Sequence, residues 1–442
     1  MKIQLSDHFT YGRLFRFVIP SIIMMIFTSL YSMVDGFFVS NYAGKLSFAA
    51  VNLIMPFFMI LGTIGFMFGA GGSAIVSATL GQKKLELARK YFSMMVYTVI
   101  VLGIIIVIIG NIFLERVAVA LGASDLTLPY IMIYGRIIII SLPFFMLQNL
   151  FQSFLIVAER PHMGLVITLI AGSMNIVLDF LLVGILKMGV KGAAIATVIS
   201  QILGGGIPFV YFIIRNKSLL RLVPTDIDFK ILGKTCVNGS SELLSNISMS
   251  VVSMVYNRQL LHFAGEDGVA AYGVIMYAGF IFAAIFIGYS IGVAPLSGYN
   301  YGAENHKELH NIFKKSLTVM GVSGIVMVLL SVSLAYPLSS IFVGYDKDLL
   351  KLTANGFRIY NLCTLFMGFS IYGSSFFTSL GDGLISALIS FLRILVFQLA
   401  CVIVLPMIFG LNGVWFSGVV AEILSIIVTV TFLIIKQKKY HY

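Results

Sequence analysis

The sequence predicts an all-α membrane protein with twelve transmembrane helices in two pseudo-symmetric lobes of six helices each, on three observations. First, 59% of the 442 residues are hydrophobic and 11% are charged, whereas soluble domains carry roughly 25% charged residues. Second, charge-free runs longer than the about 20 residues that cross a bilayer recur along the chain, at 46–80, 91–114, 192–214, 268–303 and 316–345. Third, the chain repeats itself at half its length.

Twelve spans result when the apolar runs are divided at clusters of Gly, Asn, Asp and Lys. They cover 14–38, 48–74, 91–114, 127–152, 163–186, 192–214, 235–261, 268–296, 314–337, 350–374, 384–408 and 412–435. With both termini on one side, nineteen Lys and Arg residues fall in the termini and loops on that side and six on the other. Because Lys and Arg are enriched in cytoplasmic loops, we expect both termini to lie in the cytoplasm.

The repeat has a single offset of 221 residues. It aligns Ser-Met-Val at 32–34 with 253–255, and it continues without a gap to Gly192 and Gly413. Each copy holds an even number of spans, so both copies have the same orientation, and such parallel repeats place a substrate path at their interface. We therefore expect an N-terminal lobe at 1–214, a basic cytoplasmic linker at 215–234 and a C-terminal lobe at 235–442.

Four stretches of the first lobe carry a family resemblance. They are Leu-Tyr-Ser-Met-Val-Asp-Gly-Phe-Phe-Val at 30–39, the segment from Gly-Gly-Ser at 71–73 to Leu-Gly-Gln-Lys-Lys at 80–84, Asn-Ile-Val-Leu-Asp at 175–179, and Gly-Ala-Ala-Ile-Ala-Thr at 192–197 with Gln201. In this combination the chain resembles the multidrug and toxic compound extrusion (MATE) family of secondary transporters, and within it the MepA-type bacterial branch. The resemblance implies the two-lobed MATE fold, a place in a bacterial cytoplasmic (inner) membrane and cation-coupled export of drugs.

Ionisable side chains inside the spans are the main functional candidates, because an ionised group at a helix centre costs about 2.5–3.5 kcal/mol or more. Asp35 and Asp179 lie roughly 16–21 residues into outward-running spans, about 25–30 Å from the inner surface, so they can meet. Asn175 precedes Asp179 by four residues and shares its helix face. Adjacent carboxylates in a low-dielectric site can hold a proton, or their oxygens and the Asn175 carbonyl can coordinate Na⁺. Helix capping or hydration at the outer interface is the structural alternative.

The resemblance adds a role to this pair. In MATE proteins of similar pattern the corresponding carboxylates form the cation site, which implies a cation-coupling site at Asp35, Asn175 and Asp179. In span 1, Pro20 lacks a backbone donor and is expected to supply the hinge of that helix.

Three further polar residues inside the spans are candidates for the substrate cavity. Thr197 and Gln201 share one face of span 6, where they either line the first-lobe cavity or bond a neighbouring helix. The repeat aligns Gln201 with Glu422. Glu422 and Arg393 both lie near the middle of the bilayer, so they form a buried ion pair, or Glu422 is the counter-ion of a cationic substrate.

Two other functions compete with drug export. Asp346 and Asp382 lie in sequences similar to the two motifs of intramembrane aspartate proteases, but the topology separates them by a membrane thickness of about 30 Å, so we expect no enzyme. The other candidate is a MATE-like flippase of lipid-linked saccharides or another metabolite exporter, but an acidic first-lobe cavity favours cationic cargo over pyrophosphate. We therefore expect a monomeric antiporter, without cofactor or nucleic-acid partner, that exports amphipathic, often cationic small molecules by alternating access, coupled to H⁺ or Na⁺.

Overall fold

The computed structural model describes residues 3–214 and 218–442, and its regular elements there are all helical. The first half contains α1 (Tyr11–Tyr42), α2 (Lys45–Gly81), α3 (Leu85–Ala120), α4 (Leu128–Val157), α5 (Pro161–Leu178), the π-helical turn η1 (Asp179–Ile185) and α6 (Gly189–Ile213). The second half contains α7 (Phe229–Gly302), α8 (His306–Val343), α9 (Lys347–Tyr360), the 3₁₀ turn η2 (Asn361–Cys363), α10 (Thr364–Ser379), α11 (Gly383–Phe391), the π-helical turn η3 (Leu392–Phe397) and α12 (Gln398–Tyr440).

Nine helical segments within the described ranges are long and apolar enough to cross a membrane, so the chain is a multi-pass membrane protein. Two of these segments contain a glycine with non-helical backbone angles, Gly265 in α7 (φ 61°, ψ −151°) and Gly410 in α12 (φ 56°, ψ −139°). Each of the two segments bends there and counts as two spans, and the continuous α9–η2–α10 segment is a further one. The arrangement is consistent with the predicted twelve spans.

Backbone geometry recurs at the offset found in the sequence. Gly44 and Gly265 both have positive φ, at 91° and 61°, and so do Gly189 and Gly410, at 58° and 56°. These values lie in the left-handed region that glycine adopts without steric cost, and each pair is separated by 221 residues. Equivalent bends therefore occupy equivalent places in the two halves.

The segment between the helices of the two halves is shorter than the linker predicted at 215–234. Its first three residues, 215–217, lie outside the described residues. α7 begins at Phe229 rather than at 235, because the Asp228 side chain caps it by accepting hydrogen bonds from the amides of Lys230 (3.0 Å) and Ile231 (3.1 Å). Before the cap the chain lies against α3, where the Ser93 hydroxyl accepts from the amide of Val223 (2.9 Å).

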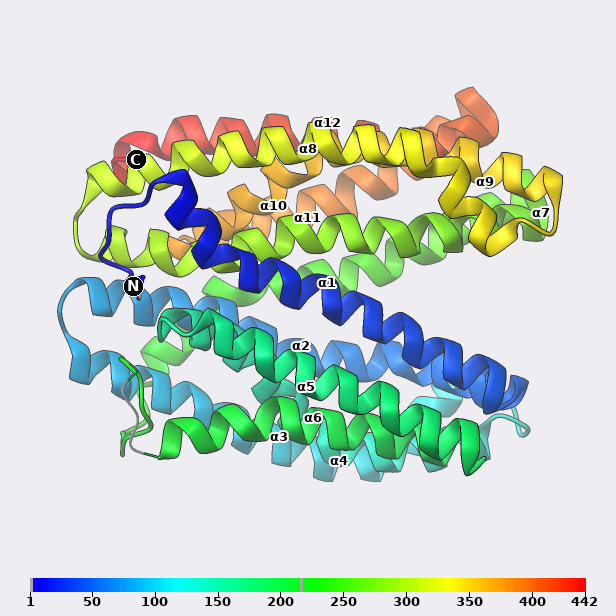
Figure 1. The fold of residues 1–442 in the computed structure, drawn as a ribbon, viewed down its shortest axis with the longest axis horizontal. Helices are drawn as coiled ribbons and strands as arrows, with labels where there is room; N and C mark the ends of the chain where they lie inside the picture. Colours follow the sequence, from blue (N-terminus) through cyan, green and yellow to red (C-terminus); the bar gives the residue numbers. More distant parts are fainter. Residues whose placement is uncertain (1–2, 215–217) are drawn as a thin grey trace.

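The helices of the two halves form separate groups, with both termini at one end of the molecule (Figure 1). Helices α2 to α6 make up the lower group in that view and α7 to α12 the upper group. α1 runs obliquely between the groups and packs against both α5 and α7, while α2 packs along α7. We call the end that carries the termini the closed end and the opposite end the open end.

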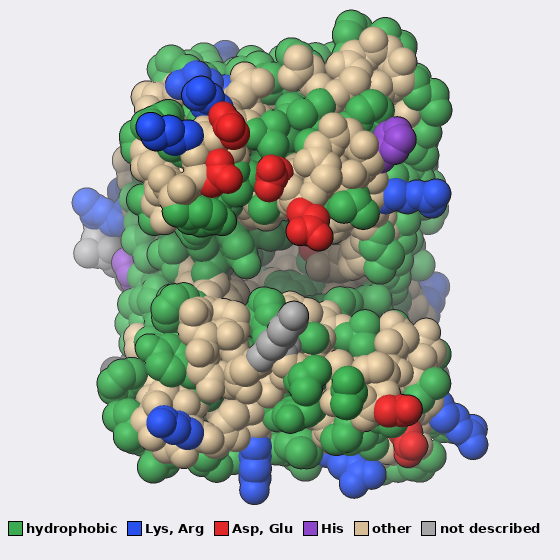
Figure 2. Space-filling view, turned by 90° about the vertical axis from the view of Figure 1, so that its right-hand side faces the viewer, with side chains coloured by type: hydrophobic (Ala, Val, Ile, Leu, Met, Phe, Trp, Pro, Cys, Tyr) green, Lys and Arg blue, Asp and Glu red, His purple; other side chains and the backbone are tan. Residues whose placement is uncertain are grey.

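Glycines allow the two groups to touch at the closed end. A methyl group on Gly239 of α7 would collide with the carbonyl of Met67 on α2, and one on Gly302 would collide with the carbonyl of Ala78. The backbones of α2 and α7 are therefore in direct contact along this seam. At the open end the groups separate, and Figure 2 shows a hollow between them on that face. The protein is thus closed at the end of its termini and open at the other.

Candidate functional site

Asp35 of α1 and Asp179 at the start of η1 lie side by side. Asp179 is fully buried and Asp35 is half-buried. Both carboxylate oxygens of Asp179, and Oδ1 of Asp35, are shielded from solvent and have no hydrogen-bond partner among the described residues. A buried acceptor without a partner requires an unseen donor, ion or water, so these oxygens fit a bound proton or cation.

The backbone around Asp179 is specialised. α5 ends at Leu178, and Asp179 opens the π-helical turn η1; π turns inside membrane or soluble helices occur often at functional sites. Asn175 lies one turn earlier, is only 2% exposed and shares the helix face of Asp179. The structure therefore gathers the three predicted coupling residues in one region of the first half.

Three side chains around the carboxylates escape prediction from the sequence, namely Tyr31, Tyr134 and Gln148. Tyr31 lies one turn before Asp35 on α1, and its hydroxyl faces the Gln148 side chain of α4. Tyr134, also on α4, lies close to both carboxylates. The four-residue spacing from Asp35 could have indicated Tyr31, whereas nothing in the local sequence of α4 points to the other two.

Thr197 and Gln201 lie half-buried on α6. The Ser141 hydroxyl of α4 donates a hydrogen bond to Gln201 Oε1 (2.5 Å), so Gln201 bonds a neighbouring helix. The Thr197 hydroxyl donates to the carbonyl of Ala193 in its own helix (3.0 Å). Both side chains keep partial exposure, which leaves room for contact with a solute.

Pro20 lies buried inside α1, and the helix continues through it without a break. The ring removes one backbone hydrogen bond from the first half of this helix. A hinge at Pro20 stays a prediction, because the structure has a single form of α1.

In the second half Arg393 and Glu422 form a buried ion pair. Arg393 of η3 donates from Nε to Oε1 of Glu422 on α12 at 2.8 Å, and Glu422 is 6% exposed. Of the two alternatives for Glu422, the structure has the ion pair. Tyr256 stands where the repeat would place the counterpart of Asp35, and its ring stacks on that of Tyr272 with centroids 5.0 Å apart.

The two aspartates of the protease alternative have structural roles. Asp346 caps α9 by accepting from the amides of Asp348 (2.9 Å) and Leu349 (3.1 Å). Asp382 accepts from the hydroxyl of Tyr440 (2.5 Å). The two carboxylates belong to different helix ends and do not form a catalytic pair.

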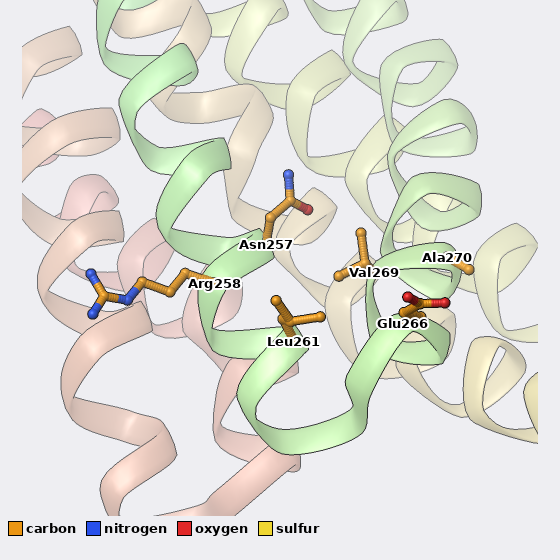
Figure 3. Close-up of a pocket in the computed structure, with 6 residues that line it drawn as sticks. All are labelled: Asn257, Arg258, Leu261, Glu266, Val269 and Ala270. Atoms are coloured by element: carbon orange, nitrogen blue, oxygen red, sulfur yellow. The ribbon is translucent and has the colours of Figure 1, made fainter. Parts of the chain in front are cut away.

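A pocket of about 590 Å³ lies at the bend of α7. Figure 3 shows Asn257 and Leu261 on the arm before the bend, and Glu266, Val269 and Ala270 on the arm after it. None of the predicted site residues lines this pocket. It is therefore a feature of the second half, distinct from the pair of aspartates.

Many membrane-crossing helices in two similar groups, a cleft between the groups and two carboxylates within the spans define a membrane transporter. The chain belongs to the MatE family, whose family model matches residues 20–181 and again residues 243–404. Members of this family are transporters and not enzymes, and they use ion coupling rather than cofactors.

Curated relatives and solved structures agree with this family. The multidrug export protein MepA of Staphylococcus saprophyticus is 26% identical over 416 residues, which cover 92% of this chain and 89% of that protein. MepA of Staphylococcus aureus (strain MSSA476) is 24% identical over 408 residues with the same coverage. A solved structure described as the outward-facing conformation of a multidrug resistance MATE family transporter has a TM-score of 0.91 and 21% identity, and the match covers 97% of this chain and 96% of that one.

Proposed function

We propose that this chain exports amphipathic, often cationic compounds from the cytoplasm in exchange for H⁺ or Na⁺, by alternating access of the cleft between its two lobes. The observation that carries the proposal is the proximity of Asp35 and Asp179, with three buried carboxylate oxygens that lack partners among the described residues. The relatives named multidrug export proteins support the drug-like cargo. A flippase of anionic lipid-linked saccharides is less well supported, because the first lobe presents acids rather than bases.

The coupling step follows from the electrostatics of the pair. Two ionised carboxylates in contact repel each other strongly in a low-dielectric site. A proton shared by the pair, or Na⁺ held by its oxygens together with Asn175, removes that repulsion and lets α1 and η1 approach. Binding of the ion from outside therefore changes the position of α1, with Pro20 as the bending point, and cargo is released from the cleft.

The rest of the proposal concerns lobes, orientation and cargo contacts. The lobes at 1–214 and 235–442 rock about the α2–α7 seam, with both termini and the closed end in the cytoplasm. The partly exposed side chains of Thr197 and Gln201 contact cargo in the first lobe. Glu422 keeps its lobe together through Arg393, which balances its charge.

The test is transport in proteoliposomes loaded with a fluorescent cation, with a pH gradient or a Na⁺ gradient imposed separately. The gradient that drives efflux of the wild-type protein identifies the coupling ion. We expect Asp35→Asn and Asp179→Asn to reduce coupled efflux to the level of empty liposomes, because neither variant retains two carboxylates. Asp125→Asn, an exposed aspartate of the same lobe, is the matched control and should transport normally. Efflux at the wild-type level by both site variants would contradict the proposal that Asp35 and Asp179 bind the coupling ion.

A further inference from the structure

The chain before α1 crosses from one half of the molecule to the other at the closed end. We call residues 3–10 the N-terminal strap. It has no regular helix, and Thr10 caps the first turn of α1. Leu5 and Phe9 have no exposed surface at all, although they belong to a terminal segment of the kind that usually frays. In Figure 1 the strap is the thin blue segment at the end where both termini lie. The strap is therefore part of the packed structure.

One end of the strap is bound to the first half. The amide of Leu5 donates to Oε1 of Glu159 at 3.0 Å, and this contact is buried. Glu159 lies in the turn between α4 and α5, where its own φ is 57°. The carboxylate thus comes from a tight turn at the closed end of the first half.

The other end of the strap is bound to α8 of the second half. The amide of Phe9 donates to Oε1 of Glu308 at 2.9 Å, and His8 Nδ1 lies 2.7 Å from Oε2 of the same carboxylate. The carbonyl of Phe9 accepts from Nζ of Lys315 (2.6 Å) and from the Asn311 amide (3.0 Å). Glu308 is 7% exposed, and hydrogen bonds of this kind, with one charged partner, are roughly twice as strong as neutral ones.

These contacts connect two bodies that must part if the closed end is to open. When the α2–α7 seam separates, Glu159 moves with one half and Glu308 with the other, so a strap bound to both cannot remain bound. We propose that the N-terminal strap is a latch that holds the closed end shut, and that Glu308 fastens it to the second half. The inference rests on the proposed alternating access, and it names the element that sets the balance between the two states.

The experiment measures the accessibility of cysteines at the two ends, in a background in which Cys236, Cys363 and Cys401 are replaced by Ser. Ser77→Cys reports on the closed end, because Ser77 is fully buried and faces Gly298 across the seam. Ala270→Cys reports on the open end, where Ala270 is exposed beside the α7 pocket. Each probe is labelled with a membrane-impermeant maleimide in proteoliposomes, with the reagent on the side of the probe.

We expect Glu308→Gln to raise the labelling rate at position 77 and lower it at position 270, so that the ratio of the two rates changes by about tenfold, the factor that loss of a hydrogen bond to a charged group produces. Asp7→Asn is the matched control, since Asp7 is an acid of the strap that binds only the nearby amide of Gln4 (3.1 Å) among the described contacts. It should change neither rate. Lys315→Met loosens the same strap contact without removing a buried carboxylate, and it should shift both probes in the direction of Glu308→Gln.

Two results overturn the inference, and they are distinguishable. If cargo or an ion gradient changes labelling at position 77 in the otherwise wild-type protein while Glu308→Gln and Lys315→Met behave like Asp7→Asn, the latch is wrong and alternating access stands. If position 77 is never labelled with any cargo or gradient, alternating access itself fails. A lower unfolding temperature with unchanged labelling ratios would make the strap a stabilising contact only, and this too would overturn the latch.

Discussion

The two halves of this transporter have similar backbone folds, but they differ in whether their main buried acidic site has a basic partner. In the first half Asp35 and Asp179 lie side by side, and no ion pair to either exists among the described residues. In the second half Glu422 is held by Arg393 at 2.8 Å, and Tyr256 occupies the place of Asp35. The repeated fold therefore contains an acidic site without a counter-charge in the first half and an acidic site with a counter-charge in the second half.

This difference indicates which half is suited to bind an ion. A carboxylate that already binds a guanidinium has little need of a proton or Na⁺, and breaking such a pair leaves an uncompensated buried charge. Two carboxylates in contact gain from either ion. The coupling site proposed above therefore lies in the first half, whereas the ion pair of the second half is expected to contribute to stability, and three measurements of stability test that difference.

The largest effect is expected from breaking the ion pair. Glu422→Gln leaves the Arg393 guanidinium buried without a counter-charge, so the free energy of unfolding in detergent should fall by about 3–5 kcal/mol. Arg393→Met combined with Glu422→Gln should recover most of the loss, because the pair is then removed as a whole. Chemical unfolding of the purified variants measures both values. If Glu422→Gln alone were as stable as the wild-type protein, this ion pair would not be what holds the second half together.

The same chemical change in the first half should have the opposite sign. Asp179→Asn replaces one of two repelling acceptors by an amide that can donate to Asp35, so we expect the free energy of unfolding to rise by about 1–3 kcal/mol even though coupled transport is lost. Asp125→Asn should leave stability unchanged. A loss as large as that of Glu422→Gln would mean that the two halves do not differ in this respect.

The smallest effect concerns the neutral counterpart of the ion pair. Ser141→Ala removes the hydrogen bond to Gln201 and should lower the free energy of unfolding by about 1 kcal/mol, well below the effect of Glu422→Gln. Ser40→Ala, an exposed serine bonded only within its own helix among the described contacts, serves as the control. If Ser141→Ala and Glu422→Gln lowered the free energy of unfolding equally, the amide of Gln201 and the carboxylate of Glu422, which the repeat aligns, would not differ in their contribution to stability.

Much of the fold follows from the sequence because lipid imposes simple rules. Apolar length sets the spans, and the 221-residue offset aligns Gly265 with Gly44 and Gly410 with Gly189, all four of which have positive φ in the structure. The depth argument for Asp35 and Asp179 uses only helical rise, and the structure places the two side by side. α7 begins six residues before the span predicted at 235–261, since the cap at Asp228 extends the helix beyond the apolar run that defines the span.

Hydrophobicity and periodicity along the chain are sufficient to predict the class of protein, the twelve spans, the repeat and the acids worth examining. Tertiary packing set which groups meet across helices, such as Tyr134 with the aspartates, Arg393 with Glu422, and the strap with Glu159 and Glu308. It also decided which end of the cleft is closed. Contacts between residues far apart in the chain depend on how the apolar helices rotate and cross. A helix that is apolar on every face can contact lipid or another helix on any side, so its sequence gives little information about which face packs against which neighbour.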